Sequence, residues 1–411
     1  MQIQDLPGVY YVEDVTYELN GSGSKIPVFI GKTGNTTTSN YKVDGTEILE
    51  FNNATEVFRA VTGTGDDWKS KTGIGAKNND GTIPSTNELG NVINEFYEEA
   101  RLLQSTDIGV PKIYVVDVGN GQSYDAWVNA IKNVKALYEA PVEVYVGLDS
   151  CTVQQEASGN NEAVPQTIPN FVESIADSIH TASRELNLRY AFFTKKDITD
   201  ADIKTLSDQC LTKLGPANIQ KLSRIGLCEP FLFGKTIARI CCTPYNTEPG
   251  YYKYRSVTKD TFIRRTLEDA TALQNKGIIF NRDEYINGNK YPKINLCVSL
   301  AFNSNSRPAD SLFHARFNAD DLLREVFEAC YTQVKANESV TNIAYLQARI
   351  NKIINDRVTA EEMVKYNEKT EMGTKLTVLQ SDDDPYSLLV KGQIQPIKCT
   401  IAIKVQATVK I

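Results

Sequence analysis

The last 15 residues of the chain alternate between apolar and polar side chains more regularly than any other segment. Ala402 is the one apolar residue on the polar side of the pattern. A side-chain period of two indicates a β-strand with one covered face, and a strand of this length extends over about 50 Å. The apolar side consists of Ile397, Cys399, Ile401, Ile403, Val405, Ala407, Val409 and Ile411. Such a strand needs neighbouring strands for its backbone and a hydrophobic surface for its apolar face.

The beginning of the chain carries a second strand signal. Residues 9–17 are rich in β-branched and aromatic side chains, and turn residues at 20–24 end this segment. Terminal segments fray unless they are tied down, and a loose apolar strand promotes aggregation. Two arrangements satisfy both ends: they pair inside their own domain, or they pair with neighbouring copies of the chain. The sequence pattern by itself leaves both open.

In the middle of the chain, strand-like and helix-like segments alternate. The predicted strands are 112–118, 142–148, 188–193 and a closing strand at 239–242. The predicted helices are 88–104, 124–139, 170–187 and 201–214, with Asp200 as the N-cap of the last. Strands that alternate with helices of this length predict an open α/β sheet.

After residue 250 the pattern changes to a mixture of helices and strands without regular alternation. The expected helices are 258–275, 318–336 and 342–355, and the expected strands are 277–280 and 294–302. Thr359 and Glu362 have the spacing of a capping box that opens a further helix.

The sequence therefore predicts a multidomain chain of the α/β and α+β classes, with extended strands at both ends. The expected parts are an N-terminal strand arm, an irregular β-rich region, an α/β domain, a C-terminal α+β domain and a C-terminal strand arm. Their limits are 1–20, 21–110, 111–250, 251–395 and 396–411.

Charge and hydropathy exclude several classes of partner. The net charge is −7, from 51 acidic and 44 basic residues, and no basic block stands out, so binding to nucleic acid or to an anionic membrane is not expected. The opening residues have neither a positive region nor an apolar stretch, and no run approaches 18 apolar residues. We therefore expect a protein that folds in a cytoplasm, without a signal peptide or a transmembrane helix.

The sequence also lacks the motifs of common catalytic sites. The Gly-Lys-Thr triplet at 234–236 resembles the end of a phosphate-binding loop, but Glu229 stands where that loop needs its first glycine. The triplet at 31–33 fails in the same way. The two histidines, His180 and His314, are interpreted as structural, and no Gly-x-Ser-x-Gly motif is present. We predict no catalytic residue, no cofactor and no metal ligand.

The cysteines and the clustered carboxylates also give no indication of a metal or catalytic site. The eight cysteines form no C-x-x-C pair, so they are expected to be reduced thiols that pack as small apolar side chains. The run of three aspartates at 382–384 has oxygen ligands suited to Ca²⁺, but it is interpreted as a solvated turn before the C-terminal strand.

The opening residues Leu6-Pro7-Gly8-Val9-Tyr10, followed by Glu13, are similar to the beginning of contractile tail sheath proteins of phages and phage-derived injection machines. The order of parts also resembles that family: a strand arm, an α/β middle, and an α+β region that ends in a strand. The tract 307–311 resembles the C-terminal region of the Mu-like branch. One departure is the absence of tryptophan from residues 277–302, where many members carry it.

The resemblance implies a structural subunit, not an enzyme, that forms a helical sheath of stacked rings around a tail tube. Its partners would be further copies of itself, the tail tube protein, and the baseplate and tail terminator proteins. The site of action would be a virion or injection particle assembled in a host cytoplasm. Inter-subunit strand pairing would involve Val9, Tyr10, Val12, Val15, Ile397, Cys399, Ile401, Ile403, Val405 and Val409. The alternatives are another self-assembling virion protein, or a cytoplasmic enzyme that binds a small ligand where the strand order reverses.

Overall fold

A computed structural model describes the chain in segments that include most of the predicted core. These are residues 25–31, 49–52, 54–57, 83, 85, 87–103, 112–117, 142–148, 172–173, 175–177, 179, 188–215, 219–243, 247–251, 253–257, 265–286, 289–302, 311–331, 340–380 and 388–397. The N-terminal strand segment, the expected helix at 124–139, the aspartate run and residues 398–411 lie outside these segments.

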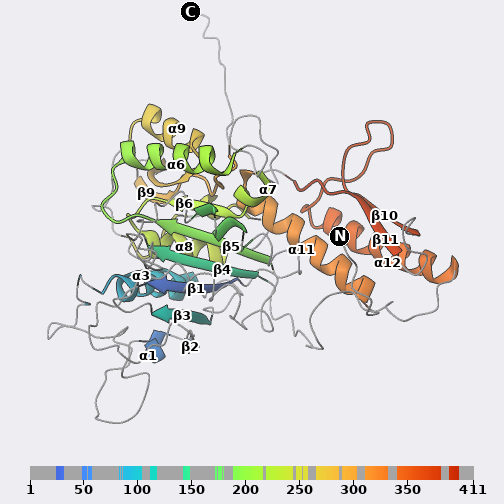
Figure 1. Ribbon diagram of the computed structural model, residues 1–411, viewed down its shortest axis with the longest axis horizontal. Helices are drawn as coiled ribbons and strands as arrows, with labels where there is room; N and C mark the ends of the chain where they lie inside the picture. Colours follow the sequence, from blue (N-terminus) through green and yellow to red (C-terminus); the bar gives the residue numbers. More distant parts are fainter. Residues whose placement is uncertain are drawn as a thin grey trace, which may run out of the picture.

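The centre of the molecule is a seven-stranded sheet with the strand order β2-β3-β1-β4-β5-β6-β7 (Figure 1). Six neighbouring strands run parallel, and β2 pairs antiparallel with β3 at one edge. The strands are β1 (Ile26–Gly31), β2 (Leu49–Phe51), β3 (Ile113–Asp117), β4 (Val142–Leu148), β5 (Leu188–Thr194), β6 (Ile225–Cys228) and β7 (Ile278–Ile279). The predicted open α/β sheet is confirmed.

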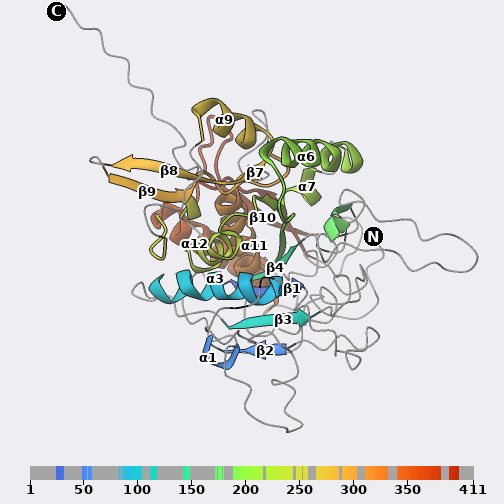
Figure 2. The ribbon, with the colours of Figure 1, turned by 90° about the vertical axis from the view of Figure 1, so that its left-hand side faces the viewer.

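Helices cover both faces of this sheet, so the side chains on both faces of its central strands are buried. Every residue of β1 and of β6 is buried, as expected for parallel strands packed on two sides. One face is covered by α3 (Glu88–Leu103) and α8 (Phe233–Cys242). The other is covered by α6 (Asp200–Leu214), α9 (Leu267–Asn275) and the helical residues between 172 and 179. Figure 2 shows α3 beside β1, and α6 with α9 near β7.

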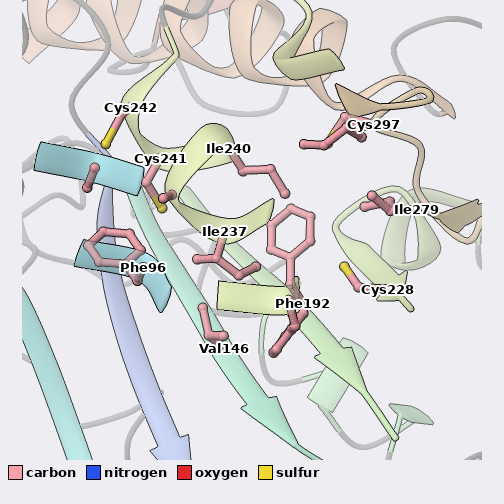
Figure 3. Close-up of a cluster of buried hydrophobic side chains, with 14 of the residues drawn as sticks. Phe96, Val146, Phe192, Cys228, Ile237, Ile240, Cys241, Cys242, Ile279 and Cys297 are labelled. Atoms are coloured by element: carbon pink, nitrogen blue, oxygen red, sulfur yellow. The ribbon is translucent and has the colours of Figure 1, made fainter. Parts of the chain in front are cut away.

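Phe96, Phe192 and Ile237 belong to the buried cluster of the first of these layers, together with Cys228, Cys241, Cys242 and Cys297 (Figure 3). Among the cysteines that the structure describes, Cys330 is half-buried and the others are buried: Cys210, Cys228, Cys241, Cys242 and Cys297. Burial raises the pKa of the Cys242 thiol to about 12, which keeps it protonated and unreactive. The prediction of inert apolar cysteines is confirmed for these six.

A second, smaller core lies beyond the sheet. It is formed by α11 (Phe313–Tyr331), α12 (Val340–Thr359) and the antiparallel hairpin of β10 (Lys375–Gln380) and β11 (Leu388–Gln393). The first half of α11 packs on the sheet through Phe313 and Phe317, whereas its second half packs on α12 through Leu322 and Val326. Figure 1 shows α11 between the two parts. This helix therefore belongs to both cores.

The remaining described elements are short or lie at the edges. They are α1 (Ala54–Val57), α7 (Ile219–Leu222), the 3-10 helix η4 (Pro249–Tyr251), and a second antiparallel hairpin of β8 (Asn281–Ile286) and β9 (Asn289–Ile294). None of the described helices is long and apolar enough to cross a bilayer.

The predicted strand at 239–242 is wrong, because these residues form the last turn of α8. Every residue of α8 is buried, including the polar residues Lys235 and Arg239. The run at 239–242 is too short to distinguish a buried helix from a buried strand. The strand that occupies this place in the sheet is β6.

Two predicted helix starts are also wrong. The helix expected at 258–275 begins at Leu267, where the Thr266 side chain accepts the N–H of Asp269 and caps the first turn. The N-cap of α6 is Thr199, not Asp200. Asp200 instead lies inside the first turn and pairs with Arg265.

The predicted capping box fails because Thr359 is the last residue of α12 rather than the start of a new helix. Glu361 has a φ of 58°, which no helix continues, and no helix is found in the described residues 360–380. The strand expected at 294–302 ends at its first residue, because β9 stops at Ile294.

Gly234 marks the closest approach between α3 and α8. A Cβ atom at this position would lie 2.2 Å from the carbonyl oxygen of Val92 and 2.6 Å from Cβ of Glu95. Glu95 also accepts the N–H of Gly234 at 3.0 Å and so caps the start of α8 from the neighbouring helix. Only glycine fits here without separating the two helices.

We expect Gly234→Ala to lower the free energy of unfolding by about 1–3 kcal/mol, the usual cost of overpacking. Urea denaturation measures this change. Glycine-to-alanine changes in helices normally stabilise by up to about 1 kcal/mol. The sign of the effect is therefore diagnostic, and a neutral or stabilising result would contradict the close approach.

Candidate functional site

The β10–β11 hairpin is the described part of the chain that is best suited to pair with a further strand. Its inner face packs on α12 through the buried side chains of Leu376 and Val378. On its outer face Leu379 and Leu389 lie opposite each other and are 44% and 47% exposed. No third described strand lies on either side of the pair. An unpaired strand edge beside exposed apolar side chains is a template for strand addition.

The predicted C-terminal strand starts close to this hairpin. After β11 the chain runs antiparallel to the segment that follows α12: Val364 N–H donates to the Gln395 carbonyl, and Ile397 N–H donates to the Glu362 carbonyl, each at 2.9 Å. Ile397 is therefore held by the backbone, and its side chain is 38% exposed. The other expected pairing residues, at 9–15 and 399–409, lie outside the described part of the chain.

Arg357 connects this anchor point to α11. Its guanidinium donates to Glu362 at 2.6 Å, to Glu325 at 2.7 Å and to Asp321, so three carboxylates surround one mostly buried cation. Burial alone would lower the pKa of Arg357, but the charges of Asp321 and Glu325 outweigh it and raise the pKa. The arginine remains charged and ties the end of α12 to α11.

Asp320 precedes Asp321 on α11, and its carboxylate binds residues of the sheet side. Arg224, in the turn before β6, contacts both of its oxygens at 2.7 and 3.0 Å, and Arg316 donates to them at 2.6 and 3.0 Å. The hydroxyl of Tyr190 on β5 donates to the same carboxylate. Only 1% of the Asp320 side chain is exposed. Asp320 thus fastens α11 to β5 and to the turn before β6.

The ionisation of this cluster follows from its partners. Burial alone would raise the pKa of Asp320, but the charges of Arg224 and Arg316 and the hydrogen bonds to the carboxylate hold it below the ordinary value of 3.8. Burial, followed by the charge of Asp320, raises the pKa of Tyr190 well above 10. Asp320 is therefore ionised and Tyr190 neutral at physiological pH.

Solved structures share this architecture. No protein-family model matches the chain, and no curated protein matches it in sequence. A chain in the baseplate of the anti-feeding prophage, determined with six-fold symmetry, matches with a TM-score of 0.56, 11% identity and 100% of both chains covered. A chain in the contracted helical sheath of this prophage gives 0.56, 10% identity and 99% of both chains. A chain in the contracted PVC sheath, from an extracellular contractile injection system, gives 0.55, 11% identity, 99% of this chain and 98% of the other.

The chain has the fold of contractile sheath subunits. The resemblance drawn from its opening residues and from the order of its parts is therefore confirmed at the level of the fold. In this sheath fold, the hairpin and the start of the C-terminal segment lie in the smaller core, and α11 connects that core to the sheet.

Residues that had been considered for chemistry have structural partners in the sheath fold. Lys235, from the Gly-Lys-Thr triplet, pairs with Glu98 at 2.7 Å within the packing of α8 on α3. His314 is buried, and its Nδ1 lies 3.0 Å from Glu248. No group of three or more His, Cys, Asp or Glu side chains among the described residues is arranged to hold a metal ion.

The arginine–carboxylate cluster was not predicted from the sequence. One signal was present, since Arg316 and Asp320 are spaced to pair along a single helix. The contacts of Arg357 and Arg224 join residues 36 and 96 positions from their aspartates, so only the fold brings them together.

We expect Asp320→Asn to lower the free energy of unfolding by about 3–5 kcal/mol, because it leaves Arg224 and Arg316 buried without their counter-charge. Asp208→Asn is the matched control, since Asp208 forms an exposed pair with Lys276 and its loss should cost less than about 1 kcal/mol. Urea denaturation compares the two. Equal effects would show that the buried cluster does not join the cores.

The same variant gives a pH signature. A carboxyl with a depressed pKa contributes stability above its unfolded value, and that contribution is lost as the pH falls through its folded value. The native chain should therefore lose stability steeply below about pH 4. Asp320→Asn should lack this part of the loss.

Proposed function

We propose that the chain is a structural sheath subunit of a contractile tail or injection machine. It polymerises helically around a tail tube, and shortening of the helix drives the tube through a target envelope. The observation that carries the proposal is the match in fold, over 99–100% of the chain, to chains of a contracted sheath and of a baseplate. The sheath would be assembled from copies of this chain, with baseplate, tube and terminator proteins as its other partners.

Strand exchange is the proposed link between subunits. The C-terminal segment, and the N-terminal segment with it, would add strands to the β10–β11 hairpin of neighbouring copies. Each ladder hydrogen bond contributes about 1 kcal/mol net, and a long strand offers many of them together with an apolar face. Links of this kind survive while packed cores rotate against each other. A head-to-tail interface that does not close on itself gives an open helix, as a sheath requires.

The two alternatives are less well supported. An enzyme that uses the open sheet would need polar groups free for chemistry. The candidate lysine and histidine of the described part, Lys235 and His314, are instead engaged by Glu98 and Glu248. Another self-assembling virion protein would share the need for strand pairing. The matched fold is, however, that of sheath assemblies.

Removal of residues 398–411 should abolish polymerisation, because it takes away the proposed inter-subunit strand. It should leave both cores folded, because the bond from the Ile397 N–H to the Glu362 carbonyl is kept. Negative-stain microscopy of the two purified chains is the measurement. Tubes or rings are expected from the full chain, and single particles with an unchanged circular dichroism spectrum from the truncated one. Sheath-length polymers of the truncated chain would overturn the link through this end.

The faces of the C-terminal strand can be tested by charge. Ile401→Lys combined with Ile403→Lys places two ions on the predicted apolar face and should block assembly, at a cost of several kcal/mol for each buried unpaired charge. The matched control is Lys404→Thr with Lys410→Thr, on the opposite face, which should assemble nearly as well as the native chain. Sedimentation of the polymers compares the pairs, and equal losses would mean that the faces are assigned wrongly.

A further inference from the structure

The two outer edges of the β10–β11 hairpin are not equivalent. The side chain of Gln347, on α12, lies along the edge of β10: its Nε2 donates to the Leu376 carbonyl at 3.0 Å, and Val378 N–H donates to its Oε1 at 2.7 Å. A carbonyl and an N–H two residues apart on one side of a strand are the groups that a neighbouring strand engages. The Gln347 carboxamide therefore stands where a third strand would lie.

The partners of this carboxamide fix its orientation. A backbone carbonyl only accepts and a backbone N–H only donates, so Nε2 faces Leu376 and Oε1 faces Val378. Nε2 also donates to Oδ1 of Asn351, one turn further along α12, at 2.9 Å. Gln347 is thus held at the strand edge both by the strand and by its own helix.

The same bonds identify which backbone groups of β10 face outward. In an antiparallel pair, successive residues turn their backbone groups alternately toward the partner strand and toward the outer edge. The backbone groups of Leu376 and Val378 face Gln347. The backbone groups of Thr377, between them, therefore face β11, where the residue opposite Thr377 is Lys391.

On β11 the same alternation turns the backbone N–H and C=O groups of the residues on either side of Lys391 away from β10. The outward backbone groups of Val390 and Gly392 are bonded by no described residue. Within the described part of the chain, one edge of the hairpin is therefore filled by a side chain, and the other is bonded by no residue.

We propose that Gln347 guards the outer edge of β10, so that pairing with a strand from another copy of this chain begins at the outer edge of β11. The inference rests on the proposed function, which supplies the incoming strand. This strand is the alternating segment 398–411 of the second copy, which follows the backbone-bonded Ile397. A hairpin with two open edges would accept strands on both sides without discrimination. The Gln347 side chain at the edge of β10 directs an incoming strand to the edge of β11. It also restrains self-association before assembly.

The guard is tested on the full chain below its polymerisation concentration, by hydrogen exchange at single-residue resolution. In Gln347→Ala the amide of Val378 should exchange at least about fivefold faster, the ratio that corresponds to one hydrogen bond of about 1 kcal/mol. In Gln347→Glu an oxygen replaces Nε2 and faces the Leu376 carbonyl with no proton between the two acceptors, so this variant should also speed the exchange of Val378. Lys352→Ala, an exposed change on the same helix, should have no effect. An unchanged rate at Val378 in the alanine variant would overturn the proposal.

Self-association provides the second readout. Gln347→Ala should self-associate at a concentration at least about fivefold lower than the native chain or Lys352→Ala, because it frees one more edge. Analytical ultracentrifugation over a dilution series measures this threshold. An unchanged threshold would contradict the guard. The proposed function is decided separately, since removal of residues 398–411 tests the strand link without touching Gln347.

Discussion

Asp320 and Asp321 are neighbours on α11, so their side chains project about 100° apart around the helix, and each binds a different part of the chain. Asp320 is surrounded by Arg224, Arg316 and Tyr190 at the sheet, and Asp321 by Arg324 and Arg357 at the smaller core. Buried ion pairs are costly to form and very costly to break singly, which favours one fixed arrangement of the groups that share them. The position of the β10–β11 hairpin relative to the sheet depends on this pair of carboxylates.

The connection continues to the end of the described chain. Arg357 binds Glu362, and the carbonyl of Glu362 accepts the N–H of Ile397, where the alternating segment begins. In the proposed lattice, tension on that segment enters at Ile397 and passes through Arg357 and Asp321 to α11, and through Asp320 to the sheet. A subunit joined in this way moves as one body while its strand links keep it attached to its neighbours.

The sequence predicted the parts of the fold that are repetitive and failed where burial removes the pattern. The strands β3, β4 and β5 were predicted within two residues, because parallel strands buried on both faces read as apolar runs. The strand β6 was missed. It is short and contains Gly226, whose missing side chain makes room for the ring of Phe192. The helix α8 was taken in part for a strand because it is buried on every side.

Part of the candidate site could likewise be predicted from the sequence, and part depends on the fold. The alternation from Ile397 onward predicts a C-terminal strand that needs partners. Both this strand and its pairing stay predictions, as do the limits of the domains. The guard at Gln347 and the cluster around Arg357 depend on contacts between residues about 30 positions apart. No sequence period encodes such contacts, and they follow only once α12 is packed on α11 and β10.

The central claim is that subunits are joined by strands added to the β10–β11 hairpin. The most direct measurement is a cryo-electron microscopy map of the polymer formed by the purified chain, at a resolution that separates β-strands. The account predicts an additional strand along the outer edge of β11, continuous with residue 397 of a neighbouring subunit. A polymer in which β10 and β11 remain a two-stranded sheet, with each C-terminal segment folded on its own subunit, would contradict it.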